Sequence, residues 1–105
     1  MSHATVCEPE RAIPVASVVD VAVVGGGTTG VMAAIGASRA GATVCLIERT
    51  ANVGGALGMG VIGHFGNGFR DKEGRALVGG APRELLQRLV ASGATPYATL
   101  EEALN

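Results

Sequence analysis

A glycine-rich turn between two apolar stretches constrains the fold of this chain more than any other feature of its sequence. Residues 18–24 (VVDVAVV) are mostly apolar and β-branched, as in a strand that is buried on both faces of a parallel sheet. The turn at residues 25–30 (GGGTTG) leads into a stretch with helical periodicity that ends near Gly41. A second apolar stretch, residues 43–47, ends at Glu48. This order predicts a strand, a helix and a second, parallel strand, and therefore an α/β fold.

The spacing of the glycines, G-x-G-x-x-G, fits the binding of a dinucleotide. Gly25 permits the tight turn after the strand, Gly27 lets a pyrophosphate approach the backbone, and Gly30 lets the helix lie close to the sheet. The anion would face unpaired N–H groups and the positive end of the helix dipole. Glu48 is placed to accept hydrogen bonds from the ribose hydroxyls of an adenosine. We therefore predict a dinucleotide site at this turn.

Composition argues against several other functions. The chain has 105 residues, a formal net charge of -1 and 3% aromatic residues. Such a balanced charge gives no basic surface for nucleic acid or an anionic membrane, and so few aromatic side chains give no stacking platform for bases. Residues 1–17 lack the apolar core of a secretory signal, and no apolar stretch reaches transmembrane length. We expect a cytoplasmic protein with no nucleic-acid partner and no membrane partner. The two cysteines have no metal-ligand spacing, so we expect no metal site.

The chain is expected to have two parts. Residues 1–19 are interpreted as an extended lead-in, and residues 20–105 as one dinucleotide-binding unit. Residues 49–68 contain seven glycines, too many for a regular helix or strand, and their apolar neighbours indicate close approach to a ligand or another chain. Further on, residues 80–93 have the pattern of an amphipathic helix, and residues 99–102 (TLEE) have the form of a capping box that opens another.

Four segments together resemble the N-terminal part of FAD-dependent oxidoreductases, especially flavoproteins related to fumarate reductase and succinate dehydrogenase. These segments are residues 20–30 (DVAVVGGGTTG), 46–55 (LIERTANVGG), 58–71 (GMGVIGHFGNGFRD) and 79–90 (GGAPRELLQRLV). The most specific part is Glu48-Arg49 followed by Gly54-Gly55, because Rossmann domains that bind only NAD do not normally have that second glycine pair at this spacing. The resemblance implies a Rossmann-like FAD-binding domain of the glutathione-reductase type.

The resemblance also implies a role for individual residues. Glu48 would hold the adenosine ribose, and Arg49 would lie on the adenine side. A first group would cradle the FAD pyrophosphate, mostly through backbone N–H groups: Gly25, Gly27, Thr28, Thr29 and Gly30. A second group would pass beside the pyrophosphate and the ribityl chain: Gly54, Gly55 and Ala56. A third would bring backbone toward the isoalloxazine ring: Met59, Gly60 and Val61.

The resemblance covers only the first part of such proteins, which have several hundred residues. Two parallel strands and one crossover helix cannot cover both faces of strands as apolar as these. We therefore expect an FAD-binding subunit or fragment of a flavin-dependent oxidoreductase. On this interpretation a larger companion chain completes the fold and supplies the site for a small-molecule substrate.

His64, within the glycine-rich segment, is a candidate catalytic acid or base, or a point of flavin attachment. The simpler interpretation is a structural histidine at a contact, since its position does not match that of the tethering histidine in relatives. Two alternative functions also remain at this stage. One is an NAD-binding Rossmann module, and the other is a non-catalytic nucleotide-binding subunit that serves assembly. The identity of the released cofactor, and whether it can be reduced, distinguishes them.

Overall fold

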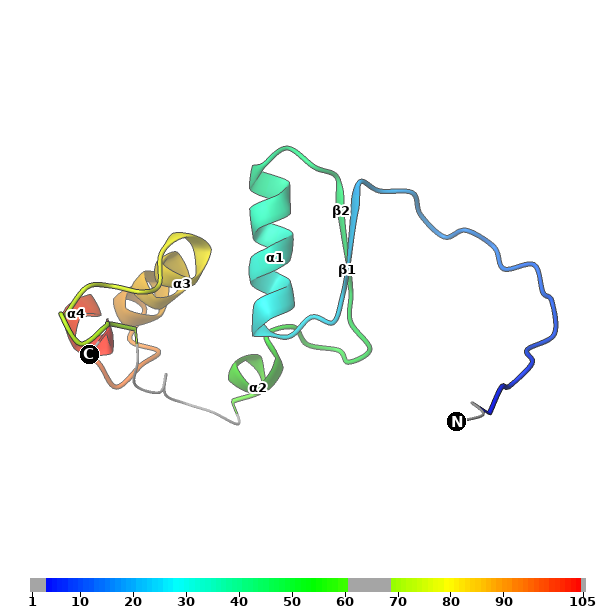
Figure 1. The fold of residues 1–105 in the computed structure, drawn as a ribbon. Coiled ribbons are helices and arrows are strands. Elements are labelled where there is room, and N and C mark those ends of the chain that lie inside the picture. Colours follow the sequence, from blue (N-terminus) through cyan, green and yellow to red (C-terminus); the bar gives the residue numbers. More distant parts are fainter. Residues whose placement is uncertain (1–3, 61–68, 105) are drawn as a thin grey trace.

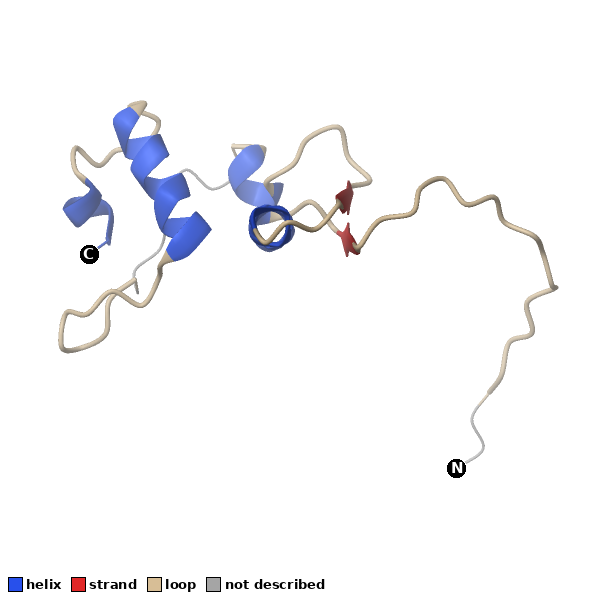
Figure 2. Ribbon diagram, turned by 90° about the horizontal axis from the view of Figure 1, so that it is seen from above, coloured by secondary structure: helices blue, strands red, loops and turns tan. Residues whose placement is uncertain are grey.

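Two parallel strands and the helix that connects them form the centre of the structure. The computed structural model describes residues 4–60 and 69–104. Its elements in chain order are β1 (Val21–Val24), α1 (Thr28–Arg39), β2 (Val44–Ile47), α2 (Gly55–Gly58), α3 (Gly80–Ala91) and α4 (Leu100–Leu104). α1 lies between the two strands on one side and α3 and α4 on the other (Figures 1 and 2). The prediction of an α/β fold with a partial βαβ unit is confirmed.

The register of the sheet is fixed at its start by Asp20 and Thr43. β1 and β2 pair in parallel, with Val21 opposite Val44 and Val24 opposite Ile47. Just before them, the N–H and the hydroxyl of Thr43 donate to Oδ2 of Asp20 over 2.8 and 2.7 Å. In return, the Asp20 N–H donates to the Thr43 hydroxyl over 3.0 Å. The predicted strand at residues 18–24 was three residues too long. Its pairing with β2 begins at Val21, and residues 18–20 have no partner residue in β2.

The end of α1 follows from a glycine. Gly41 has a φ of 92°, a left-handed conformation that costs an ordinary side chain energy. Its N–H donates to the Ser38 carbonyl over 3.0 Å, and the Ala42 N–H donates to the Ala37 carbonyl over 3.2 Å. This is the pattern of a Schellman motif, which satisfies the last carbonyls of a helix. The prediction that the helix stops at Gly41 is confirmed.

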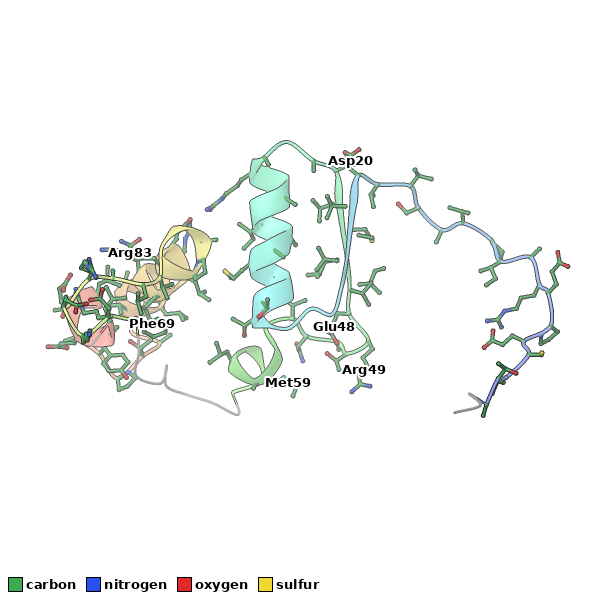
Figure 3. The ribbon with its side chains drawn as sticks, in the orientation of Figure 1. Asp20, Glu48, Arg49, Met59, Phe69 and Arg83 are labelled. Carbon is green, nitrogen blue, oxygen red and sulfur yellow. The ribbon has the colours of Figure 1, made fainter. Side chains whose placement is uncertain are left out.

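The buried core lies away from the sheet, between α3 and α4. In the described part of the chain the buried hydrophobic residues are Leu86, Ala103 and Leu104. Side chains that pack around them, including that of Phe69 (Figure 3), come from both helices and from the segments beside them: Phe69, Val90, Tyr97 and Leu100. The strands, in contrast, leave Val24 81% and Ile47 49% exposed. As expected for two parallel strands and one crossover helix, the strands are not covered on both faces, although their composition is typical of a sheet that is.

The segment between residues 69 and 77 forms a turn whose charges are paired. Leu77 donates its N–H to the Phe69 carbonyl over 2.7 Å, and Arg70 and Ala76 form an antiparallel bridge. The Asp71 carboxylate accepts hydrogen bonds from the backbone and the side chain of Arg75. Arg70 contacts Glu101 and so joins this turn to α4.

An ion pair links α3 to α1. Glu84 accepts from Arg39 of α1 over 2.6 Å and from Arg88, one turn along α3, over 2.7 Å. α3 begins at Gly80, so Pro82 occupies its first turn, where a missing N–H is tolerated. At α4, the Glu102 N–H donates to the Thr99 hydroxyl over 3.2 Å, as the capping-box sequence predicts.

The chain as a whole is extended. Its radius of gyration is 18.8 Å, whereas a compact domain of this length has about 13 Å. Residues 4–20 run away from β1 without a helix or strand (Figure 1), and Val6, Ile13, Val15 and Val18 are exposed there. The division of the chain at residue 20 stays a prediction. Within residues 4–60 and 69–104, no helix combines the length and the apolar character needed to cross a bilayer.

The hydrogen bonds between Asp20 and Thr43 should stabilise the fold in a way that depends on pH. Hydrogen bonds from Thr43 hold the pKa of the Asp20 carboxyl below its ordinary value of 3.8. A lowered folded-state pKa means that this contribution is fully present above the unfolded value and is lost as the pH falls through the folded value. We expect Asp20→Asn to lower the free energy of unfolding at pH 7, and the difference from wild type to shrink below about pH 4. Urea unfolding followed by circular dichroism across this range measures it, and a difference independent of pH would contradict the assignment.

Candidate functional site

The turn from β1 into α1 brings the helix unusually close to the end of the strand. A β-carbon on Gly30 would lie 1.8 Å from the Gly25 carbonyl oxygen, a distance no real contact allows. Gly25 itself has a φ of 102°, and its N–H extends the sheet by donating to the Ile47 carbonyl over 2.8 Å. Because Gly25 and Gly30 have no side chains, the first turn of α1 can lie directly beside the carboxyl end of the sheet.

The first turn of α1 offers backbone donors and a positive dipole end. Gly27 is the N-cap residue, no side chain caps the helix, and its first turn contains no acidic residue. The first backbone bond of the helix runs from the Val31 N–H to the Gly27 carbonyl over 2.9 Å. The N–H groups of Thr28, Thr29 and Gly30 therefore have no partner within the helix. Such a helix start attracts an anion.

The second glycine segment packs directly against this turn. The Gly54 N–H donates to the Gly26 carbonyl over 2.7 Å, and the Thr28 hydroxyl donates to the Gly54 carbonyl over 3.0 Å. Gly54 and Gly55 have φ angles of 99° and 59°, and a β-carbon on Gly55 would lie 3.3 Å from the Gly27 Cα. The chain then forms the single turn of α2. The expectation that residues 49–68 contain no helix is thus wrong at Gly55–Gly58, where these contacts fix the backbone.

An open groove of about 620 Å³ runs along these two segments. It is lined mostly by glycine and small apolar side chains, and its polar side chains are two threonines. The lining residues are Val23, Val24, Gly25, Gly27, Thr28, Thr29, Gly30, Ala33, Gly55 and Ala56. Seven of the predicted cofactor-binding residues therefore line one groove: Gly25, Gly27, Thr28, Thr29, Gly30, Gly55 and Ala56.

Glu48 lies at the carboxyl end of β2 with both carboxylate oxygens engaged (Figure 3). Its Oε2 accepts from the Gly26 N–H over 2.7 Å, and its Oε1 accepts from the N–H and the hydroxyl of Thr50 over 2.8 and 2.9 Å. These donors, those of Thr50 first and that of Gly26 after them, hold the pKa of Glu48 below its ordinary value of 4.5. The carboxylate is therefore ionised at neutral pH and suited to accept hydrogen bonds from hydroxyl groups.

Sequence reasoning missed two residues of this arrangement, Gly26 and Thr50. Gly26 is buried, and a β-carbon there would lie 2.9 Å from both Cβ and Oε2 of Glu48. A third consecutive glycine, at a position that the motif leaves free, was the available signal. For Thr50 the sequence offers no comparable signal, since its role depends on how the loop after β2 folds back.

The remaining predicted residues lie outside the groove lining. Arg49 is exposed beside Glu48, and Met59, 56% exposed, ends α2 (Figure 3). Gly60 follows with a φ of 71°. Val61 and His64 lie outside the described residues, so their predicted roles stay predictions. Within residues 4–60 and 69–104, no cluster of three His, Cys, Asp or Glu side chains could hold a metal ion.

Comparison with known families gives a match over most of the chain. The sequence model of the family described as FAD dependent oxidoreductase matches residues 20–104. The matched region begins at Asp20 and includes both glycine segments, Glu48, α3 and α4. No curated protein and no solved structure matches the chain. The narrower resemblance to the fumarate reductase branch stays a prediction.

Two glycines of α1 provide a matched pair of substitutions. We expect Gly30→Ala to destabilise the fold by about 1–3 kcal/mol, because its methyl group would collide with the Gly25 carbonyl. Gly36 lies in the same helix, and a methyl group there would meet nothing within 4 Å, so Gly36→Ala should stabilise by about 0.5–1 kcal/mol. Chemical unfolding of both variants measures this. Equal effects would contradict the described packing of α1 against the turn.

Proposed function

Since the chain belongs to the family of FAD dependent oxidoreductases, we propose that it holds the ADP half of FAD while a larger companion chain completes the enzyme. FAD is the cofactor of this family. When bound, FAD supplies the transfer of a hydride or electrons to or from a substrate, and the protein supplies binding, orientation and electrostatics. The residues that the structure describes fit the binding and orientation part of that task.

The start of α1 is the observation that best supports this proposal. Its first residues line the groove, its dipole has its positive end there, and no acidic residue in the first turn would repel a pyrophosphate. A β-carbon on Gly27 would meet nothing within 4 Å, so protein packing alone does not require glycine there. A ligand that approaches the backbone closely would require it. On this proposal, glycine at position 27 serves the close approach of the cofactor and not the packing of the chain.

Glu48 would serve the adenosine end. Its ionised carboxylate lies just after β2, the strand that follows α1, at the carboxyl end of the sheet. A carboxylate there accepts hydrogen bonds from ribose hydroxyls and disfavours a 2′-phosphate. Arg49, exposed next to it, is proposed to lie on the adenine side.

The substrate site is proposed to lie mostly on the companion chain. Among the described residues that line the groove, the polar side-chain groups are the hydroxyls of Thr28 and Thr29, and neither is an effective acid or base at neutral pH. His64 is kept as a candidate acid or base. Turnover that is unchanged in His64→Ala would exclude that role. The substrate is proposed to be a small molecule, and the expected location is the cytoplasm.

The uncovered strands support the proposal of a companion. Parallel sheets occur with both faces covered, and two strands alone are marginally stable. Here the apolar side chains of β1 and β2 are partly or mostly exposed, up to 81% for Val24. Strands and helices from a companion chain would cover them and extend the sheet beyond β1.

Gly27→Ala separates cofactor binding from folding. The φ of Gly27 is -65°, which alanine adopts without strain, and its methyl group would meet no protein atom. We expect the stability to change by no more than about 1 kcal/mol. FAD affinity, measured by fluorescence quenching or calorimetry, should fall at least about tenfold. An unchanged FAD affinity would contradict the proposal that the pyrophosphate lies against this residue.

The substitution Val24→Asp tests whether a companion chain covers β1. If a companion covers β1, a buried charge at this position should prevent assembly, because an unpaired carboxylate is costly in an apolar contact. The isolated chain should tolerate the same change, since Val24 is exposed in it. Leu77→Asp, at a residue 63% exposed in the turn after Phe69, is the control outside the sheet. Copurification and size-exclusion chromatography measure assembly, and equal behaviour of the two variants would contradict a contact at β1.

A further inference from the structure

Thr50 lies between Glu48-Arg49 and Gly54-Gly55, at a position to which the motif assigns no role, and it makes two contacts with Glu48. Its N–H and its hydroxyl both donate to Oε1 of Glu48, over 2.8 and 2.9 Å. We propose that Thr50 is a positioning residue that orients the Glu48 carboxylate toward the ribose of FAD and so sets the affinity for the adenosine half. This inference rests on the proposed function and assigns a role within the same site.

The single hydroxyl proton of Thr50 has two possible acceptors. Its Oγ1 lies 2.9 Å from Oε1 of Glu48 and 2.9 Å from the Asn52 carbonyl oxygen. A hydroxyl donates only one hydrogen bond at a time. A hydrogen bond to an ionised acceptor is roughly twice as strong as one to a neutral acceptor. The Thr50 hydroxyl therefore donates its hydrogen bond to the carboxylate of Glu48. The hydroxyl therefore holds Glu48, and Asn52 is the weaker alternative.

The arrangement leaves one direction free for a ligand. A carboxylate oxygen has about two lone-pair sites, and the two Thr50 donors fill those of Oε1. Oε2 receives one bond, from the Gly26 N–H over 2.7 Å, and keeps one site. A ribose hydroxyl would donate to that remaining site. Gly26 and Thr50 thus hold the carboxylate from two sides and present the rest of Oε2.

A Glu48 carboxylate that is already held in place before the cofactor arrives favours binding of the cofactor. Glu48 belongs to the class of long side chains that lose much rotamer freedom when they are fixed. With Thr50 in place, that loss occurs on folding and not on binding of the cofactor. Without its hydroxyl, backbone N–H groups alone remain to hold the carboxylate, and the side chain turns more freely.

The test compares Thr50→Val, which keeps the shape and removes the hydroxyl, with Thr50→Ser, which keeps the hydroxyl. Each variant is purified as the full chain with whatever partner copurifies, stripped of flavin, and titrated with FAD, ADP and FMN. We expect Thr50→Val to weaken the binding of FAD and ADP by up to about tenfold, the cost of fixing one long side chain on binding. Binding of FMN, which lacks the adenosine, should be unchanged, and Thr50→Ser should behave like wild type.

Other outcomes would overturn the inference. Unchanged binding of FAD by Thr50→Val would show that the hydroxyl does not position Glu48, and tighter binding would show that it competes with the ribose. An equal loss for FAD, ADP and FMN would indicate damage to the loop as a whole. Two further results separate this inference from the proposed function. If wild type binds no FAD, both fail; if wild type binds FAD and Glu48→Gln leaves the affinity unchanged, the inference about Thr50 fails while FAD binding by the chain stands.

Discussion

The close packing of two glycine segments around the start of α1 is the constraint on which the candidate site depends. One hydrogen bond, 2.7 Å from the Gly54 N–H to the Gly26 carbonyl, joins the segments, but a single such bond contributes only about 1 kcal/mol. The absence of side chains matters more: a β-carbon on Gly55 would lie 3.3 Å from the Gly27 Cα of the other segment, and one on Gly30 would lie 1.8 Å from the Gly25 carbonyl oxygen of its own turn. This close packing leaves the first residues of α1 at the lining of an open groove.

The distribution of burial explains why the site needs further polypeptide. The three buried hydrophobic residues of the described chain, Leu86, Ala103 and Leu104, lie between α3 and α4. The sheet that presents the glycine turn leaves Val24 and Ile47 largely exposed. Full burial of one such side chain is worth about 1.5–3 kcal/mol, against a total stability of about 5–15 kcal/mol for a typical domain. A companion that covers the sheet would therefore strengthen the part of the chain that binds the cofactor.

The sequence predicted the order of elements and the first glycine turn well, because apolar periodicity and glycine spacing are local signals. The stop of α1 at Gly41 and the cap at Thr99 were predictable for the same reason. The short helix at Gly55–Gly58 was not, since it depends on contacts with residues almost thirty positions earlier. Likewise, the contact of Thr50 with Glu48 depends on the path of a loop. The exposure of the strands was also expected from the sequence, because their composition fits a complete sheet, whereas residues 4–60 and 69–104 contain two strands.

Native purification of the chain from its source, with a visible spectrum of the product and mass spectra of its polypeptides and released cofactor, tests the central claim most directly. We predict a yellow complex that contains FAD and a larger companion chain. A colourless chain alone, or one that releases NAD in place of FAD, would contradict the claim that it holds the ADP half of a flavin cofactor in a multi-chain oxidoreductase.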